Sequence, residues 1–259
     1  MEFSHSFHSL YCVVTLAMLG TVLILKSPIL RRRLQLKLGT MHHRLINYTP
    51  IGHMDILSPV SRHRLRLVKR KTLVLDMDDT LIKSYFDYSR SRSWRRRRPP
   101  KTSSIEPDFS FYSQSGDVHV SVYKRPHLDY FLKCVAKWYN VMIFTAATKS
   151  YAARVLDHLD GDNEIFQRRL YRHNCIDVCG LLAKYVSLCD RDATNVVLID
   201  DSHVANSFNV GNSLHIKPYK PGSRDEELLA LLPFLDALRF THDVRSVLGR
   251  VTRYDCLTT

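Results

Sequence analysis

Three short apolar runs along the chain each stop at a polar side chain. Runs of this length, bounded by polar residues, are typical of strands buried inside a parallel sheet. Ligand sites of such sheets lie at the carboxyl ends of the strands. The pattern therefore predicts that the polar residues meet at one rim. The runs are residues 73–75 before Asp76, 141–144 before Thr145, and 196–199 before Asp200.

Helical patterns separate these strands. Apolar residues recur at helical spacing over 126–139 and 151–159, and short strands are expected at 170–171 and 214–216. A helix is expected over 225–238, and an amphipathic stretch over 240–248 either packs on the sheet or offers a groove to a partner. Alternating strands and helices predict an α/β fold, a doubly wound parallel sheet with right-handed crossovers.

An insertion separates the first strand from the first helix. Residues 109–112 and 118–123 alternate around Ser115-Gly116, which predicts a β-hairpin that forms a small cap above the rim. The insertion begins with an arginine-rich stretch, residues 88–104, which we expect to be a solvated flap because like charges repel. Nucleic-acid binding, a targeting signal and steering of an acidic phosphosubstrate are the alternative roles.

Residues 10–25 carry no charged side chain. As a helix this stretch would span about 24 Å, against about 30 Å for a typical bilayer core. No Lys or Arg precedes it, as a cleaved signal peptide would need, whereas Arg31, Arg32 and Arg33 follow it. We therefore predict a membrane anchor over 1–30 with the rest of the chain cytosolic. A hairpin or interfacial insertion is left open at this length.

The charge of the chain favours anionic partners. Of 259 residues, 38 are Lys or Arg and 25 are Asp or Glu, a formal net charge of +13. A basic linker is predicted over 31–66, resting on an anionic leaflet or solvated, followed by a folded domain over 67–250 and a tail over 251–259. The cysteines show no C-x-x-C pair, so free thiols are expected and a zinc site at His173, Cys175 and Cys179 is not.

Asp76 and Asp78 stand two residues apart where the first strand ends. Two carboxylates this close repel, so a metal ion or a shared proton is expected between them. Asp76 suits a nucleophile held by Mg²⁺, and Asp78 suits a general acid that later activates water. The alternative is an acidic turn that merely ends a strand.

Later residues extend this pair to a set. Asp76 and Asp78, then Thr145, then Lys184, then Asp200 and Asp201 follow in an order that resembles the haloacid-dehalogenase superfamily. The D-x-D-x-T form that ends at Thr80 narrows the resemblance to phosphatases related to the RNA polymerase C-terminal-domain phosphatases. Further stretches across about residues 48–250 resemble the Dullard-like nuclear-envelope branch. They are 55–62, 69–71, 124–127, 231–241 and 244–248.

The resemblance implies a haloacid-dehalogenase-like fold and a Mg²⁺-dependent serine/threonine protein phosphatase at the endoplasmic reticulum and nuclear envelope. It implies phosphorylated protein substrates such as lipin, and a small membrane regulatory subunit as partner. It makes Asp76 the nucleophile, Asp78 the acid/base, Thr145 a ligand of the phosphoryl group and Lys184 a neutralising cation. Mg²⁺ is then held by Asp76, Asp78, Asp200 and Asp201.

The sequence also departs from the branch it resembles. Close relatives carry Asn where Asp201 stands and Pro where His203 stands, which indicates a diverged paralogue. A catalytically weak scaffold that binds phosphoproteins or the regulatory subunit is the alternative function, and nucleic acid is not expected as a partner.

Overall fold

The computed structural model describes residues 57–88 and 105–255. The predicted anchor over 1–30, the linker up to residue 56 and residues 89–104 of the arginine-rich stretch lie outside these ranges. Within the described ranges, every helix is too short or too polar to cross a membrane.

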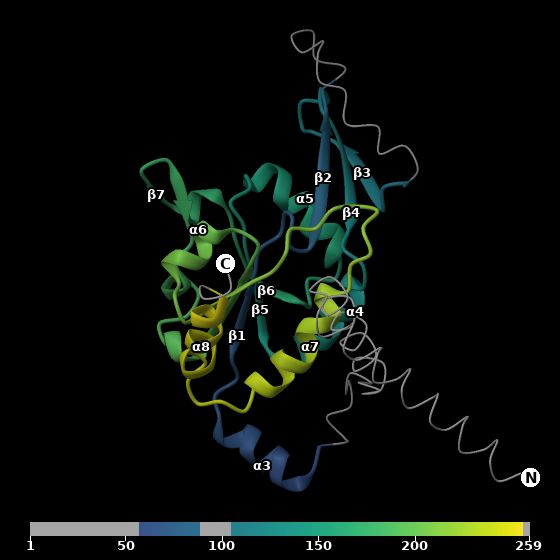
Figure 1. The fold of residues 1–259 in the computed structure, drawn as a ribbon. Coiled ribbons are helices and arrows are strands. Elements are labelled where there is room, and N and C mark those ends of the chain that lie inside the picture. The colour runs from purple at the N-terminus through teal and green to yellow at the C-terminus, as the bar shows by residue number, and fades with distance from the viewer. Residues whose placement is uncertain (1–56, 89–104, 256–259) are drawn as a thin grey trace, which may run out of the picture. The chain divides into compact units, whose positions relative to one another are not determined.

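A five-stranded parallel sheet forms the centre of the domain, in the order β10-β9-β1-β5-β6 (Figure 1). Strand β1 lies in the middle, paired with β5 on one side and β9 on the other. All of its residues are buried, and because side chains alternate between faces, both faces must be covered. The predicted α/β parallel sheet is confirmed. The strands are β1 (Thr72–Leu75), β5 (Asn140–Phe144), β6 (Phe166–Leu170), β9 (Val196–Asp200) and β10 (Ser213–His215).

The helices bury the apolar stripes that the sequence predicts. In α4 the buried residues include Leu128, Phe131, Leu132 and Val135, which lie on one side of a helix. The helix begins two residues later than Pro126 because His127, its N-cap, has a left-handed backbone with φ of 67°. The helices beside the sheet are α4 (Leu128–Trp138), α5 (Lys149–Leu159), α6 (His203–Phe208), α7 (Glu227–Leu238) and α8 (Arg245–Asp255).

An antiparallel cap sheet stands at one end of the domain, in the order β2-β4-β3 (Figure 1). Strands β3 (Phe109–Tyr112) and β4 (His119–Lys124) confirm the predicted hairpin, whose turn contains Gly116 with φ of 75°. The third strand, β2 (Ile82–Asp87), was not predicted. Its residues mix polar and aromatic side chains without a clean alternation, because one of its faces packs against helix α5 rather than solvent.

Two further elements differ from the sequence prediction. Helix α3 (Pro59–Leu67) lies mostly within the predicted linker and was not predicted; it begins after Ser58, whose hydroxyl accepts a hydrogen bond from the Ser61 amide. A short hairpin of β7 (Ile176–Val178) and β8 (Leu181–Ala183), which was not predicted, precedes Lys184. Of the two alternatives for the C-terminal stretch, the full burial of Val244 and Leu248 agrees with packing against the domain.

Arg125 ties the cap to the rest of the domain. Its guanidinium is fully buried and makes a bidentate ion pair with Asp225, at 3.0 and 2.9 Å. It also donates to the main-chain carbonyls of Thr80 and Lys217, at 2.9 and 2.8 Å. One side chain therefore joins the turn after β1, the end of β4 and the segment before α7.

We predict that Arg125→Met lowers the free energy of unfolding by about 3–5 kcal/mol, because it leaves Asp225 charged and buried without its partner. Denaturant unfolding measures the change. The matched control is Arg224→Met, which breaks the exposed pair of Arg224 with Glu226 and should cost less than about 1 kcal/mol. Equal losses in the two variants would contradict this role for Arg125.

Candidate active site

The ends of three neighbouring strands place the polar side chains predicted from the sequence at one rim. Leu75 at the end of β1 is in register with Ile143 of β5 and Ile199 of β9. The amide of Asp76 donates to the Ile199 carbonyl at 3.0 Å, which carries the ladder one residue past the strand. Parallel strands in register thus bring Asp76 level with the ends of both neighbours.

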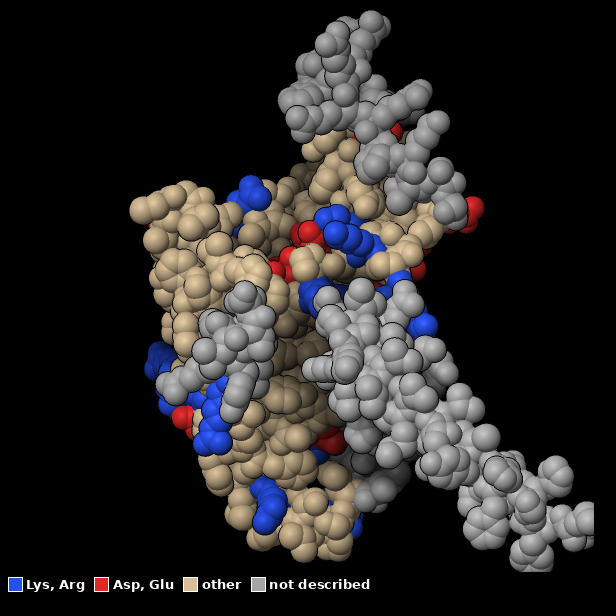
Figure 2. Space-filling model, viewed as in Figure 1, with Lys and Arg blue, Asp and Glu red and all other residues tan. Residues whose placement is uncertain are grey.

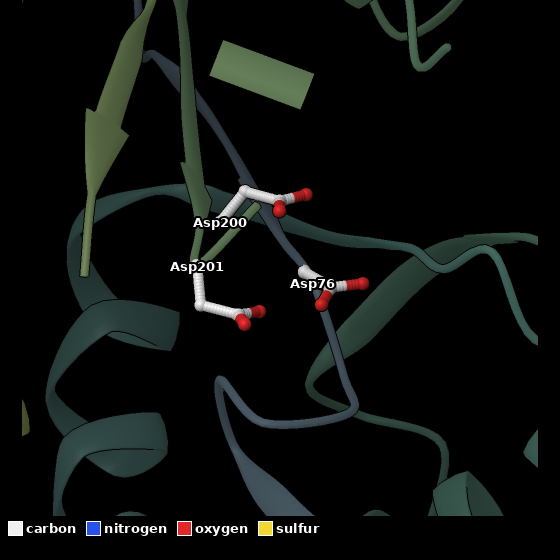
Figure 3. Close-up of side chains that lie close together, drawn as sticks. All are labelled: Asp76, Asp200 and Asp201. Carbon is white, nitrogen blue, oxygen red and sulfur yellow. The ribbon is translucent and has the colours of Figure 1, made fainter. Parts of the chain in front are cut away.

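Asp76, Asp200 and Asp201 form a cluster in which one carboxylate oxygen from each lies within 4.8 Å of the others. Figure 3 shows the three side chains directed into the same space from the ends of β1 and β9. Carboxylate oxygens in this number and spacing suit a hard cation such as Mg²⁺. The carboxylate of Asp78 is not part of the cluster. The resemblance assigns to the metal the main-chain carbonyl of this residue, and the carboxylate to proton transfer.

Lys184 neutralises part of this charge. Its ammonium lies 2.5 Å from Asp76 Oδ1 and 2.7 Å from Asp200 Oδ2, and all three side chains are buried. Burial alone would lower the pKa of Lys184, but the two carboxylates outweigh it and hold that pKa above its usual value. Burial raises the pKa of Asp76 to about 8 against the opposing effect of Lys184. The site therefore carries more negative charge than one ammonium balances.

Asp78 lies beside this cluster and is held by a residue that the sequence analysis missed. The hydroxyl of Tyr151, in α5, donates to Asp78 Oδ1 at 2.6 Å and lies 2.5 Å from Ser84 Oγ in β2. Burial raises the pKa of Asp78 to about 6, although the Tyr151 bond works in the opposite direction. Nothing in the spacing of Tyr151 along the chain marks it, since it stands in the first turn of a helix far from the D-x-D pair.

Thr80 fixes the position of Asp201. Its hydroxyl donates to Asp201 Oδ1 at 3.1 Å and accepts from the Asp201 amide at 3.2 Å. The chain turns at Asp79, directly before Thr80; its φ is 63° and its carboxylate pairs with Lys83 at 2.5 Å. Thr80, the last residue of the D-x-D-x-T pattern, thus links the loops that follow β1 and β9.

A cleft of about 450 Å³ opens over these groups between the sheet and the cap. Thr145 lies in its wall, and because its Oγ1 accepts from the Ala147 amide at 3.0 Å, its proton is available to a ligand. Phe86 of β2 adds an aromatic wall, and Arg172 adds a second cation that sequence reasoning missed. Figure 2 shows acidic and basic atoms together just below the cap strands.

The other metal candidate is absent from the described part of the chain. Groups of three potential ligands among the described residues reduce to the aspartate cluster, so His173, Cys175 and Cys179 do not assemble a zinc site. The four cysteines that the structure describes are free thiols, in keeping with the expectation from the sequence.

Comparison with known proteins gives consistent similarities. Residues 71–245 match the family described as NLI interacting factor-like phosphatase. The CTD nuclear envelope phosphatase 1 homolog of Drosophila melanogaster is 42% identical over 206 residues, 79% of this chain and 83% of that protein. CTD nuclear envelope phosphatase 1 of Xenopus tropicalis is 42% identical over 210 residues, 80% of this chain and 83% of that protein. The solved structure of Fcp1, an essential RNA polymerase II CTD phosphatase, aligns with a TM-score of 0.47 and 26% identity over 69% of this chain and 53% of that one.

We predict that Lys184→Met lowers the free energy of unfolding by about 3–5 kcal/mol at neutral pH, because it leaves Asp76 and Asp200 buried without a cation. Removing Lys184 takes away the group that opposes the rise in the pKa of Asp76, so the variant keeps its Asp76 proton to a higher pH than the wild type, in which this pKa is about 8. The loss should therefore grow as pH rises above about 8, where Asp76 is ionised and paired only in the wild type, and level off below it. Unfolding curves at several pH values measure both effects. Lys217→Met, at a side chain that is 81% exposed, is the control and should change little. A pH-independent loss would contradict the charge argument.

Proposed function

The chain belongs to the NLI interacting factor-like phosphatase family and is a protein phosphatase, and from this premise we propose that it hydrolyses phosphoserine and phosphothreonine through an aspartyl-phosphate on Asp76. The observation that carries the proposal is the buried cluster of Asp76, Asp200 and Asp201 bridged by Lys184 at the floor of the cleft. In this arrangement a nucleophile, a cation site and a compensating charge share one small volume.

In the first step, an oxygen of Asp76 attacks the phosphorus and the bond to the serine or threonine oxygen breaks. Asp78 gives its proton to that leaving oxygen, a role for which a pKa raised to about 6 is suited. Thr145 donates its hydroxyl proton to a phosphoryl oxygen, and Lys184 offsets negative charge on Asp76. The step is therefore mostly positioning and charge neutralisation.

In the second step, Asp78 takes a proton from water, the water oxygen attacks the phosphorus, and the bond to Asp76 breaks. Tyr151 keeps the Asp78 carboxylate directed into the cleft throughout, because its hydroxyl is anchored beside Ser84. Asp76, Asp200 and Asp201 would hold Mg²⁺, with the main-chain carbonyl of Asp78 as a further ligand. When bound, Mg²⁺ supplies positive charge against the phosphoryl oxygens.

We further propose that the protein works on a membrane, as part of the nuclear envelope and endoplasmic reticulum. The support is the uncharged stretch at residues 10–25 and the nuclear-envelope location in the names of the 42% identical relatives. Lipin-type phosphoproteins as substrates and a small membrane regulatory subunit as partner follow from the sequence resemblance. The scaffold alternative differs from this proposal in one measurable respect, which is that it predicts no turnover.

We predict that Asp76→Asn reduces hydrolysis of p-nitrophenyl phosphate by at least about 10⁴-fold, because an amide cannot act as the nucleophile. The control is Asp129→Asn, the same change at a carboxylate that is 71% exposed and outside the cleft, which should retain activity. Steady-state rates with Mg²⁺ measure both. Retained hydrolysis in Asp76→Asn would mean a different nucleophile, and an inactive wild type would favour the scaffold.

We predict that Mg²⁺ raises the thermal unfolding midpoint of the wild type. The free energy of unfolding should increase by about 2.7 kcal/mol when the Mg²⁺ concentration is a hundred times its dissociation constant. Asp201→Ala should shift the midpoint titration to higher Mg²⁺ because it removes one of three carboxylates. Asp129→Ala serves as control. A Mg²⁺ titration that is identical in Asp201→Ala and wild type would remove Asp201 from the metal site.

A further inference from the structure

The end of the domain opposite the cap is strongly basic. Residues 57–71, which run through α3 into β1, contain six Lys or Arg residues and no Asp or Glu. In Figure 1 this segment lies at the far end from strands β2–β4, and the charged atoms visible over α3 in Figure 2 are blue. The cations are Arg62, Arg64, Arg66, Lys69, Arg70 and Lys71.

Helix α3 contributes nothing to the core. None of its residues is buried, and Arg62, Arg64 and Arg66 are all exposed. Two large apolar side chains are exposed with them, Val60 at 65% and Leu67 at 67%. Helix α3 thus exposes arginines together with aliphatic side chains, and interfacial helices present this combination to anionic bilayers.

A pocket of about 190 Å³ lies beside α3, at the amino ends of the strands. Leu65 and Val68 line it on one side and Trp138 on another. Its polar lining is entirely cationic, and no carboxylate lines it. The cations are Lys69, Arg70, Lys71, Lys137 and Arg239.

Carboxylates and main-chain carbonyls both contact these cations. Lys69 pairs with Asp190 and Arg239 with Asp236. Arg70 donates to the main-chain carbonyls of Ala136 and Tyr139, at 2.7 and 2.8 Å. The buried ammonium of Lys71 likewise donates to main-chain carbonyls, those of Arg239 and Thr241. Carbonyls orient these groups without cancelling their charge.

We propose that α3 and this basic pocket form a membrane-contact surface, in which the pocket takes the phosphate of an anionic lipid headgroup. Guanidinium and ammonium groups are the side chains that bind phosphate oxygens best. The exposed arginines of α3 lie against the charged leaflet, while Val60 and Leu67 reach the acyl boundary. Helix α3 is also the first described element after the predicted anchor, so it is already held near a bilayer if that anchor inserts.

This surface adds a specific contact to the membrane location proposed above, and the inference depends on that proposal. It also fixes an orientation, because α3 and the cleft are at opposite ends of the parallel strands. With α3 on the lipid, the aspartate cluster faces the aqueous phase, where a phosphorylated protein reaches it and a lipid phosphate in the same leaflet does not.

The test uses the full chain and vesicles of phosphatidylcholine with or without phosphatidylserine, and measures the preference for the anionic vesicles by cosedimentation. This ratio removes any binding by the N-terminal stretch that is independent of charge. The triple variant Arg62→Glu, Arg64→Glu, Arg66→Glu should lose on the order of 100-fold of the preference. The control reverses three exposed lysines elsewhere, Lys133, Lys217 and Lys220, and should keep it.

A second pair of variants tests the pocket on one helix. Lys137→Glu, which lines the pocket, should lose about tenfold of the preference. Lys133→Glu, one turn earlier in α4 and outside the lining, should not. Inorganic phosphate should compete with anionic vesicles more strongly than chloride at the same ionic strength in the wild type, and lose that advantage in Lys137→Glu.

Hydrolysis of p-nitrophenyl phosphate should be unchanged in all of these variants, which shows that the fold and the cleft are intact and separates this test from that of the catalytic proposal. An unchanged preference in the α3 variant overturns the membrane contact. An equal loss in the three-lysine control overturns it too, because net charge alone would then explain binding. Phosphate competition without any preference for anionic vesicles means that the pocket binds free phosphate and not a lipid.

Discussion

The ion pairs of Lys184 with Asp76 and Asp200 are the constraint on which the site depends. A parallel sheet delivers carboxylates from adjacent strand ends to the same few ångströms, where their mutual repulsion and loss of water oppose folding. The buried ammonium of Lys184, which follows the β7–β8 hairpin, offsets this repulsion. It lies 2.5 Å from the Asp76 carboxylate and 2.7 Å from that of Asp200. The fold is thereby able to keep an excess of negative charge ready for a cation.

Buried cations perform a second task, which is to hold loops that have no regular structure. Arg125 fixes the turn after β1 through the Thr80 carbonyl, and Thr80 in turn holds Asp201 from both its oxygen and its amide. A chain of contacts therefore runs from the Asp225 ion pair to the aspartate cluster. Because each contact is directional, the protein scaffold itself orients the Asp201 carboxylate.

Much of this site was predictable because strand ends are visible in a sequence. Asp76, Thr145 and Asp200 each follow an apolar run that forms a strand. The strand expected at 170–171 is β6, which covers residues 166–170, and helix α6 was not predicted. Lys184 was found through its place in a family-like order and not through the hairpin that carries it. Tyr151 and strand β2 were missed because their roles arise from tertiary contact: the Tyr151 hydroxyl meets Asp78 only after α5 and β2 pack together.

Asp201 stands where the sequence resemblance leads us to expect Asn. Such an exchange would change the charge of the site but not the hydrogen bonds of this side chain's oxygen. Its Oδ1 accepts from Thr80, a bond that an asparagine oxygen would make equally well, so the geometry does not require a carboxylate. The formal charge does change: with every group ionised, three carboxylates and one ammonium give two net negative charges, whereas an asparagine would give one. Burial already raises the pKa of Asp201, so its ionised form is costly without a cation nearby. With every carboxylate ionised, the net charge of the cluster would be equal and opposite to that of a divalent ion.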